Sequence, residues 1–532
     1  MIKNKGQILI LGFALFAMFF GAGNLIFPPF LGRFSNSSYF SSMIGFLMTG
    51  VGLPLLGIIA VAISRGGVEK MSERIHPIFG SVLAVIIVLI IGPLFAIPRT
   101  CATTFELSIL PNLPWINSWI FSFIYFAVTL FFAINPSSAI DRIGKYLTPV
   151  ILLTVLLLIV AGVIYPISTI DANSLPHPFG HGFLEGFQTM DLIGSTVMGM
   201  MILNQLIRKG YNNKSDQVKM LALAGVVSAI CLAFVYGGLL YLGATTSSVA
   251  GEFTRPGLLV FITNSLLGPY GKIALSVLVS FACLTTAVAL TVLNGEYLSK
   301  VSKGKLGYRW TCVGACVVSL IVSNLGVGKI VQFAVPPLVA LYPMVIVIVF
   351  FSFINKYIKD NYIFRGAVFG AFVIGLIKAG KALGLEHDQI NSWYEYIPLV
   401  DLELGWIATS LAGAFVGELL GRMKKIVSSQ RIVTEEESGG GNLGGGGFNN
   451  NGETESYQRD DIPDVMPTGV YAYVQKRLGA IQQSHYTTKA TNSGALIVHQ
   501  NADYAEEENS EFISKYGDIS SMGKDIFVQP SS

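Results

Sequence analysis

Residues 21–24 form a Gly-Ala-Gly-Asn segment in the middle of the apolar run 13–29, which is long enough to cross a bilayer. In hydrocarbon, an unpaired backbone amide costs several kcal/mol. Two glycines and an asparagine at that depth therefore predict a broken helix whose free backbone lines a cavity or holds a ligand. Glycine-mediated helix packing is the alternative, but Asn24 and the pair Pro28 and Pro29 favour a true break.

A carboxylate and two hydroxyl groups also lie within apolar stretches. Asp191 falls in the stretch 183–206, and a carboxylate at membrane depth indicates a role in binding or coupling. An internal ion pair with Arg99 is the alternative. Thr285 and Thr286 offer two neighbouring hard oxygens of the kind that suits Na⁺, although threonine hydroxyls in helices also bond to the preceding turn.

Arg99 follows a proline in the apolar stretch 78–107, and Glu106 comes seven residues later near the same helix face. A charged residue at that depth should face the bundle interior or reach out to the interface. We therefore expect an ion pair on the outer side, which acts either as a gate or as a purely structural pair.

The elements that must position these groups are membrane helices. The sequence of 532 residues is 52% hydrophobic and 13% charged, with a mean hydropathy of +0.60, far from soluble averages. Most apolar stretches approach the roughly 20 residues that a spanning helix needs, and 257–298 must contain a loop near 267–269. About twelve stretches recur, at 8–32, 39–63, 78–107, 117–134, 145–166, 183–206, 217–243, 257–298, 310–327, 330–354, 363–384 and 401–421.

Lysine and arginine placement predicts that both termini are cytoplasmic. With the N-terminus inside, the inner segments hold 21 of these residues and the outer loops hold 6. Residues 1–427 then form a twelve-span domain. Residues 428–532 carry 7 basic and 15 acidic residues and a Gly-rich stretch at 439–447, which predicts a disordered or weakly folded cytoplasmic extension, or an appended segment. A short helix is expected at 470–481 within it.

The membrane part lacks a nucleophile and base grouping, a phosphate-binding loop and a nucleic-acid motif. His177 and His181 lack further ligands, so turn residues are favoured over a metal site. The sequence thus predicts no enzyme, no cofactor and no nucleic-acid partner; its partners are the lipid bilayer and a small molecule, and it names no protein partner.

Three motifs carry a family resemblance: Phe19–Pro29 (FFGAGNLIFPP), Glu185–Asp191 (EGFQTMD) and Ala282–Ala287 (ACLTTA). Together they resemble the bacterial branched-chain amino acid:cation symporter family, over about residues 5–425. The resemblance implies an all-α fold similar to the leucine-transporter type, with spans one to five and six to ten as inverted repeats and two further helices. Inverted repeats predict that span six breaks as span one does, and Gln188–Asp191 supplies the polar interruption.

The resemblance implies a site for a zwitterionic amino acid. The amides of Ala22 and Gly23 at a helix N-terminus would hold its carboxylate, and Asp191 with carbonyls of span six would accept from its ammonium. The expected substrate-binding residues are Gly21, Ala22, Gly23, Asn24, Gln188, Thr189 and Asp191. By analogy, Na⁺ would lie among Ala17, Phe20, Ala282, Thr285 and Thr286, and a second cation near Asn24.

These observations predict a secondary active transporter in a bacterial cytoplasmic membrane, which imports leucine, isoleucine and valine with Na⁺ or H⁺ by alternating access. A membrane sensor that binds an amino acid without net transport is the alternative, as is a symporter of another small neutral substrate. Ion binding between spans one and eight would fix the substrate half-helix in place and so couple the two ligands.

Overall fold

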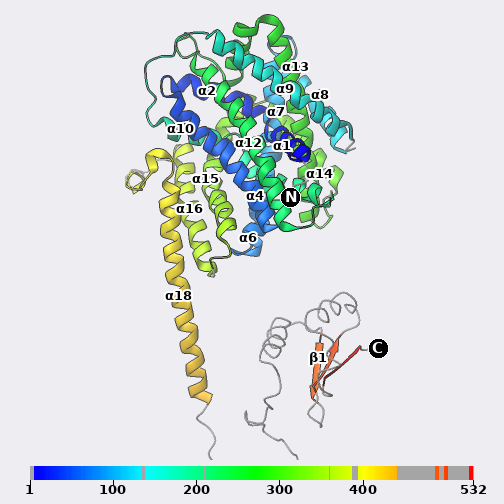
Figure 1. Ribbon diagram of the computed structural model, residues 1–532, viewed down its shortest axis with the longest axis vertical. Helices are drawn as coiled ribbons and strands as arrows, with labels where there is room; N and C mark the ends of the chain where they lie inside the picture. Colours follow the sequence, from blue (N-terminus) through cyan, green and yellow to red (C-terminus); the bar gives the residue numbers. More distant parts are fainter. Residues whose placement is uncertain are drawn as a thin grey trace, which may run out of the picture. The chain divides into compact units, whose positions relative to one another are not determined.

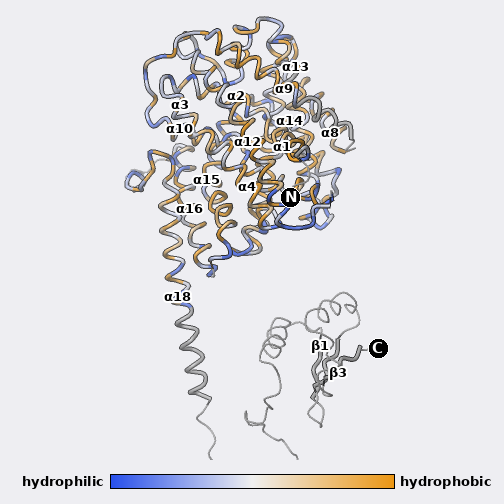
Figure 2. The backbone as a smooth tube through the Cα atoms, in the orientation of Figure 1, coloured by the Kyte–Doolittle hydropathy of each residue, from blue (hydrophilic) through white to orange (hydrophobic). Residues whose placement is uncertain are grey.

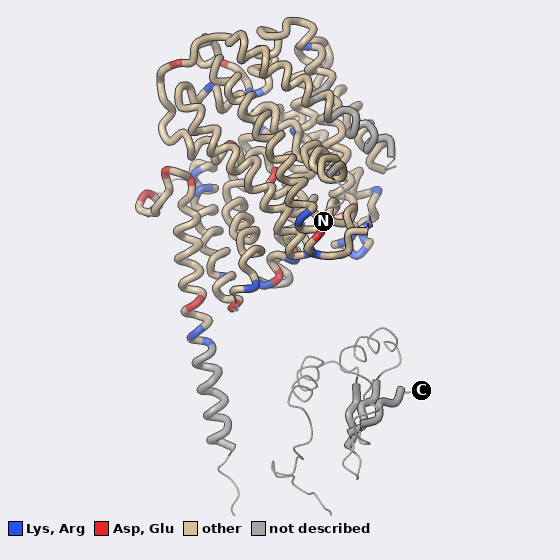
Figure 3. Tube along the Cα trace, viewed as in Figure 1, with Lys and Arg blue, Asp and Glu red and all other residues tan. Residues whose placement is uncertain are grey.

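The computed structural model describes residues 5–134, 138–208, 210–358, 360–385, 393–439, 486–490, 496–500 and 526–530. By its contacts the chain divides into two units, Met1–Gly440 and Gly441–Ser532. The described part of the first unit is helical (Figure 1). Its helices are mainly apolar along their length (Figure 2), and its charged residues gather mainly near the helix ends (Figure 3).

The first three predicted spans are each interrupted. Span one consists of α1 (Lys5–Phe19) and α2 (Ala22–Ser35). Spans two and three contain π-helical turns, in which each amide bonds five residues back. Their segments are α3 (Tyr39–Leu47), η1 (Met48–Gly52), α4 (Leu53–Ser64), the short α5 (Val68–Met71), α6 (Pro77–Leu89), η2 (Ile90–Leu94), α7 (Ala96–Thr104) and η3 (Phe105–Ile109).

The remaining predicted spans also fall on described helices. Span eight lies in α13, where the backbone of Gly268 (φ 66°, ψ −163°) breaks the helix at the expected position. The break is a kink of one non-helical residue rather than the expected loop. These elements are α8 (Ser118–Ile134), α9 (Ser138–Ile164), α10 (Pro178–Phe187), α11 (Asp191–Arg208), α12 (Lys214–Ala244), α13 (Arg255–Val301), α14 (Tyr308–Ser323), α15 (Gly326–Ile354), α16 (Asn361–Ala382), η4 (Val400–Leu402) and α18 (Gly405–Gly439).

The helices are long and apolar enough for a multi-pass membrane protein. Among the described residues, seven helices could cross a bilayer by length and composition, or eight when the bent pair α1 and α2 counts as one span. Shorter apolar helices lie at Ser118–Ile134, Leu152–Ile164 and Tyr308–Ser323. The all-α membrane fold expected for this part of the chain is confirmed.

Two groups of helices meet at the broken spans. In the first group, α10 packs along α3, α2 and α1 pack along α12, and α11 packs along α4. In the second group, α13 packs against α7, η3, α8, α9 and α14. The first group therefore contains both broken spans, and the second presents α7 and α13 to them.

Glycines allow the helices of the first group to approach at backbone distance. A side chain added at Gly32 of α2 would collide with the Leu240 carbonyl of α12, and one at Gly243 would collide with the Pro29 carbonyl. Similarly, Gly182 of α10 lies against the backbone of Ser42 in α3. Small residues at such contacts bring membrane helices together, so packing glycines do occur here, at positions other than the first-span break.

The described residues of the second unit are three strands, β1 (Tyr486–Ala490), β2 (Leu496–Gln500) and β3 (Ile526–Pro530). β1 pairs with β2 in antiparallel register, and β2 pairs with β3 in parallel register. The helix expected at 470–481 lies outside the described residues. α18 continues past the predicted boundary at 427, and the character of the extension stays a prediction.

Candidate functional site

The first span breaks where the Gly-Ala-Gly-Asn segment predicts. α1 ends at Phe19, α2 begins at Ala22, and the two helices meet at an angle of 72°. The side-chain oxygen of Asn24 accepts a hydrogen bond of 3.1 Å from the amide of Gly21, which closes the turn that enters α2. Ala22 and Gly23 therefore belong to the first turn of a helix, where backbone amides have no partner within the helix.

The sixth span is broken as well. α10 ends at Phe187 and α11 begins at Asp191, so three residues separate the half-helices. Met190 takes a left-handed conformation with φ 64°. The Thr189 hydroxyl donates to the carbonyl of Gly186 at 2.9 Å and accepts from the amide of Asp191 at 3.4 Å. The discontinuous sixth helix that was expected from the family resemblance is present.

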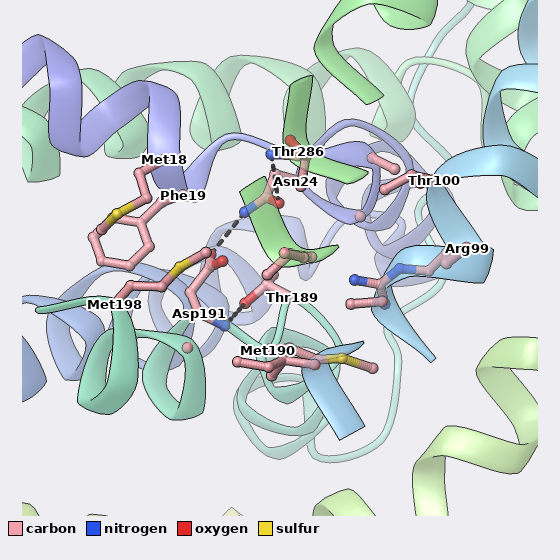
Figure 4. Close-up of a pocket in the computed structure, with 17 residues that line it drawn as sticks. Met18, Phe19, Asn24, Arg99, Thr100, Thr189, Met190, Asp191, Met198 and Thr286 are labelled. Atoms are coloured by element: carbon pink, nitrogen blue, oxygen red, sulfur yellow. Dashed lines mark hydrogen bonds between the residues drawn. The ribbon is translucent and has the colours of Figure 1, made fainter. Parts of the chain in front are cut away.

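Hydrogen bonds join the two breaks. The Asn24 amide nitrogen donates to the Asp191 carboxylate at 2.7 Å (Figure 4). The same nitrogen contacts the hydroxyl of Tyr236 on α12. Both Asn24 and Asp191 are buried, and Tyr236 has no exposed surface. Sequence reasoning selected the first two residues and missed Tyr236. Its hydroxyl in the middle of an apolar stretch was the available signal, because a buried tyrosine hydroxyl usually finds a partner.

Arg99 of α7 reaches the sixth-span break from the second group of helices. The side chain is 4% exposed, and its Nη1 donates to the carbonyl of Gln188 at 2.6 Å. The carbonyl of Gln188, which was among those expected to accept from a substrate ammonium, thus already accepts one hydrogen bond from Arg99. The buried Nε of Arg99 has no hydrogen-bond partner within the part of the chain that the structure describes.

The ion pair expected between Arg99 and Glu106 does not form in this structure. Glu106 instead accepts a hydrogen bond of 2.8 Å from the amide of Val327 in the first turn of α15. Glu106 lies in the π-helical turn η3, so the α-helical spacing that placed it on the face of Arg99 does not apply. A carboxylate at a helix N-terminus is favourable in its own right.

A different ion pair lies near Arg99. Glu185 of α10 pairs with Arg255, the first residue of α13. The guanidinium carbons of Arg99 and Arg255 lie 5.2 Å and 5.1 Å from the ring centroid of Phe27. Phe27 therefore contacts both the guanidinium at the break and the arginine of this ion pair. Sequence reasoning gave no role to Phe27 or Arg255.

A pocket opens between the two breaks, and residues from both breaks line it. Its described lining holds one acidic side chain, Asp191, and one basic side chain, Arg99. Gly21, Ala22, Gly23, Asn24, Thr189 and Asp191 from the expected substrate set line it, and Gln188 does not. The apolar lining comes from Met18, Phe19, Ile91, Met190, Met198 and Leu290.

Some of the expected cation ligands lie beside the same break. The hydroxyls of Thr285 and Thr286 both donate to the carbonyl of Ala282, at 3.0 Å and 2.9 Å. Thr286 also lines the pocket, and a methyl group added to Gly21 would lie 3.6 Å from its Cγ2. Ala17 lies on α1, and Phe20 lies buried in the break itself. Within the described residues, His, Cys, Asp and Glu side chains do not gather in threes.

Comparisons with known proteins agree with this geometry. A family model described as "Branched-chain amino acid transport protein" matches residues 4–424. The chain is 36% identical over 422 residues to the branched-chain amino acid permease BraB of Bacillus subtilis (strain 168), covering 77% of this chain and 95% of that one. BrnQ of the same organism is 35% identical over 428 residues, with 78% and 97% covered.

Two further comparisons extend this likeness. The branched-chain amino acid transport system 2 carrier protein of Pseudomonas aeruginosa is 34% identical over 447 residues, covering 80% of this chain and 100% of that one. Among solved structures, the inward-facing conformation of Mhp1 matches with a TM-score of 0.52 and 13% identity, over 78% of this chain and 90% of that one. The likeness to Mhp1 concerns the fold, which is of the leucine-transporter type, as expected.

Proposed function

We propose that this chain, which belongs to the branched-chain amino acid transport protein family, imports leucine, isoleucine and valine together with a cation by alternating access. The observation that carries the proposal is the pocket at the two breaks, which has one acidic group, one basic group and a largely apolar lining. An amino acid with an aliphatic side chain has the matching combination of two opposite charges and an apolar part.

Each part of such a substrate has a suitable neighbour. Asp191 is the acceptor for the ammonium, and the amides in the first turn of α2 are donors for the carboxylate. The apolar lining suits the aliphatic side chain. Because an apolar pocket distinguishes one methylene by only about 1 to 3 kcal/mol, leucine, isoleucine and valine should compete for it.

Sodium is the proposed coupling ion. The hydroxyl oxygens of Thr285 and Thr286 keep lone pairs after donating to the Ala282 carbonyl, so they remain able to bind a cation. The carbonyls of Ala17 and Phe20 would complete the ligands, with a second cation near Asn24. An ion held between α13 and the first-span break would hold α2 in position, which links ion binding to substrate binding.

The proposed location is a bacterial cytoplasmic membrane, with both termini cytoplasmic because basic residues concentrate in the inner loops. Breaks in the first and sixth spans support an inverted repeat of spans one to five and six to ten. Transport by this route needs no covalent chemistry, so we expect no enzymatic activity. Residues 428–532 are proposed to be an extension outside the transport domain.

Uptake of radiolabelled leucine into proteoliposomes tests the proposal. An inward Na⁺ gradient should drive accumulation, and Li⁺ and H⁺ gradients of equal size should drive less. Unlabelled isoleucine and valine should inhibit uptake, whereas lysine and glutamate should not; stronger inhibition by lysine or glutamate than by valine would contradict the substrate assignment. Vesicles without protein and vesicles with a collapsed gradient are the controls.

The same experiment separates a transporter from a sensor. A sensor with this pocket would bind leucine but accumulate none inside the vesicles. Binding measured on the purified chain, beside uptake measured on the same preparation, decides between them. Binding without accumulation under any of the three gradients would overturn the transport proposal.

A further inference from the structure

We infer that Arg99 binds the substrate carboxylate directly, together with the first turn of α2, and that Arg99 and Asp191 recognise the two ends of a zwitterion. This inference rests on the proposed function and adds to it a recognition residue from the second group of helices. It assigns the guanidinium to the substrate instead of to an outer gate.

The position of the guanidinium supports this role. Arg99 lines the pocket, and Figure 4 shows its side chain extending from α7 toward the space between the two breaks. A methyl group added to Gly23 would lie 2.8 Å from its Nη2, so the guanidinium packs directly against the backbone of the first turn of α2. The positive end of a helix and a full positive charge therefore occupy one side of the pocket.

Arg99 also has N–H donors beyond the one that bonds to the Gln188 carbonyl. A guanidinium carries five N–H donors, and among the described residues this one donates a single hydrogen bond, to the Gln188 carbonyl. Its Nε is buried and has no partner in the described residues. A buried unpaired donor is costly, and a carboxylate ligand is the group that matches the planar fork of arginine.

Protein carboxylates do not meet this demand in the structure. Glu106 bonds to the amide of Val327, and Glu185 pairs with Arg255. Asp191 receives its hydrogen bond from Asn24 and forms no ion pair with Arg99 in the described part of the chain. The pocket therefore has a positively charged group, Arg99, and a negatively charged group, Asp191, and a zwitterionic amino acid can bind to both.

A structural role is the competing explanation, because Arg99 also holds the Gln188 carbonyl at the sixth-span break. The two roles differ in what they predict for a substrate without a carboxylate. L-leucinamide keeps the ammonium and the side chain of leucine and replaces the carboxylate with a neutral amide. Affinities of the purified full-length chain for L-leucine and L-leucinamide, measured by calorimetry, distinguish the two roles.

Arg99→Gln should weaken leucine binding by about tenfold to a hundredfold, as expected for the loss of charge-assisted hydrogen bonds. Leucinamide binding should stay equal or become tighter, because a cationic ligand no longer meets the guanidinium. Equal losses for both ligands would overturn the inference and assign Arg99 to support of the break. If the wild-type chain bound no leucine at all, the proposed function itself would fail.

Two further variants complete the test. Arg33→Gln is the matched control, since Arg33 also binds backbone carbonyls, those of Val249 and Gly251 among them, but does not line the pocket. Its ratio of leucine affinity to leucinamide affinity should equal that of the wild type. Arg99→Lys keeps the charge, and it serves as the test if Arg99→Gln does not purify. A ratio of leucine affinity to leucinamide affinity below that of the wild type supports the inference, and an unchanged ratio overturns it.

Discussion

The side-chain amide of Asn24 donates a 2.7 Å hydrogen bond to the carboxylate of Asp191. Asn24 lies in the first turn of α2 and Asp191 in the first turn of α11, so this contact joins the half-helices that follow the two breaks. The same nitrogen contacts the hydroxyl of Tyr236 on α12. A ligand that breaks or strengthens this hydrogen bond would therefore change how firmly α2 and α11 are held together.

Asp191→Asn keeps the shape of the side chain and removes its charge. We expect leucine binding or its Na⁺ dependence to weaken at least about tenfold, equivalent to 1.4 kcal/mol, because the ammonium loses its anionic partner. Binding of labelled leucine to the purified variant measures this. Asp171→Asn is the control, since Asp171 bonds locally to Asn173 and does not line the pocket.

The alternative is that Asp191 only neutralises Arg99. The variant Asp191→Asn would then lose thermal stability, and a second change of Arg99 to Gln would restore both its melting temperature and its transport. We expect no such rescue, because Asp191 and Arg99 form no ion pair in the structure and both line the pocket. Recovery of both properties in the double variant would defeat a direct role for Asp191.

Gly23→Ala should weaken leucine binding while the protein stays folded. The added methyl group would lie 2.8 Å from both Nη2 of Arg99 and Cε2 of Phe27, closer than real contacts allow, so the guanidinium must shift. We expect a loss of about tenfold or more, measured by calorimetry, from misplacement of one charge-assisted contact.

Gly314→Ala is the matched control for that substitution. Gly314 lies inside α14, and a methyl group there would meet no atom within 4 Å among those that the structure places. Since alanine is favoured over glycine inside a helix, this variant should be as stable as the wild type or slightly more stable, with unchanged leucine binding. Unchanged binding in Gly23→Ala would show that the guanidinium does not need its observed position.

The sequence predicted both breaks because polar groups in apolar runs have few explanations. Gly21 and Asn24 could be placed within a residue or two, since free backbone in hydrocarbon needs a ligand or a side-chain partner. The fold followed from the family motifs together with the recurring apolar stretches. Helices long enough to span a bilayer are visible in the composition alone, because they need about 20 mainly apolar residues.

The contacts of individual side chains were harder to predict. The pairing of Arg99 with Glu106 assumed a regular α-helix, and the π-helical turn η3 changes which residues share a face. Tyr236 comes from a span far along the chain, and its contact with Asn24 depends on helix packing that no local pattern encodes. Local periodicity therefore predicts elements, whereas the partners of a buried polar group depend on tertiary packing.

Deletion of residues 441–532 should leave leucine uptake unchanged. The contacts of the chain divide at this position, and the family match ends at residue 424. Proteoliposomes with equal amounts of full-length and shortened protein provide the comparison. A shortened chain that purifies normally and binds leucine but loses uptake would show that the extension takes part in transport.

Replacing both Thr285 and Thr286 with alanine should sharply weaken the Na⁺ dependence of uptake. The variant removes two hard oxygens from α13, and one of the two residues, Thr286, lines the pocket beside the first-span break. We expect the half-saturating Na⁺ concentration for leucine uptake to rise by about tenfold or more, and leucine affinity at saturating Na⁺ to change much less.

Thr291→Ala separates this effect from ordinary helix packing. Thr291 lies on the same helix, and its hydroxyl donates to the Ala287 carbonyl at 2.7 Å, as Thr286 donates to Ala282, but it does not line the pocket. If the threonine hydroxyls only bond to carbonyls of their own helix, both the double variant and Thr291→Ala should change the melting temperature. Neither should then change the half-saturating Na⁺ concentration. If α13 holds the coupling ion, only the double variant should change that concentration, because only it removes the hydroxyl of a residue that lines the pocket, Thr286.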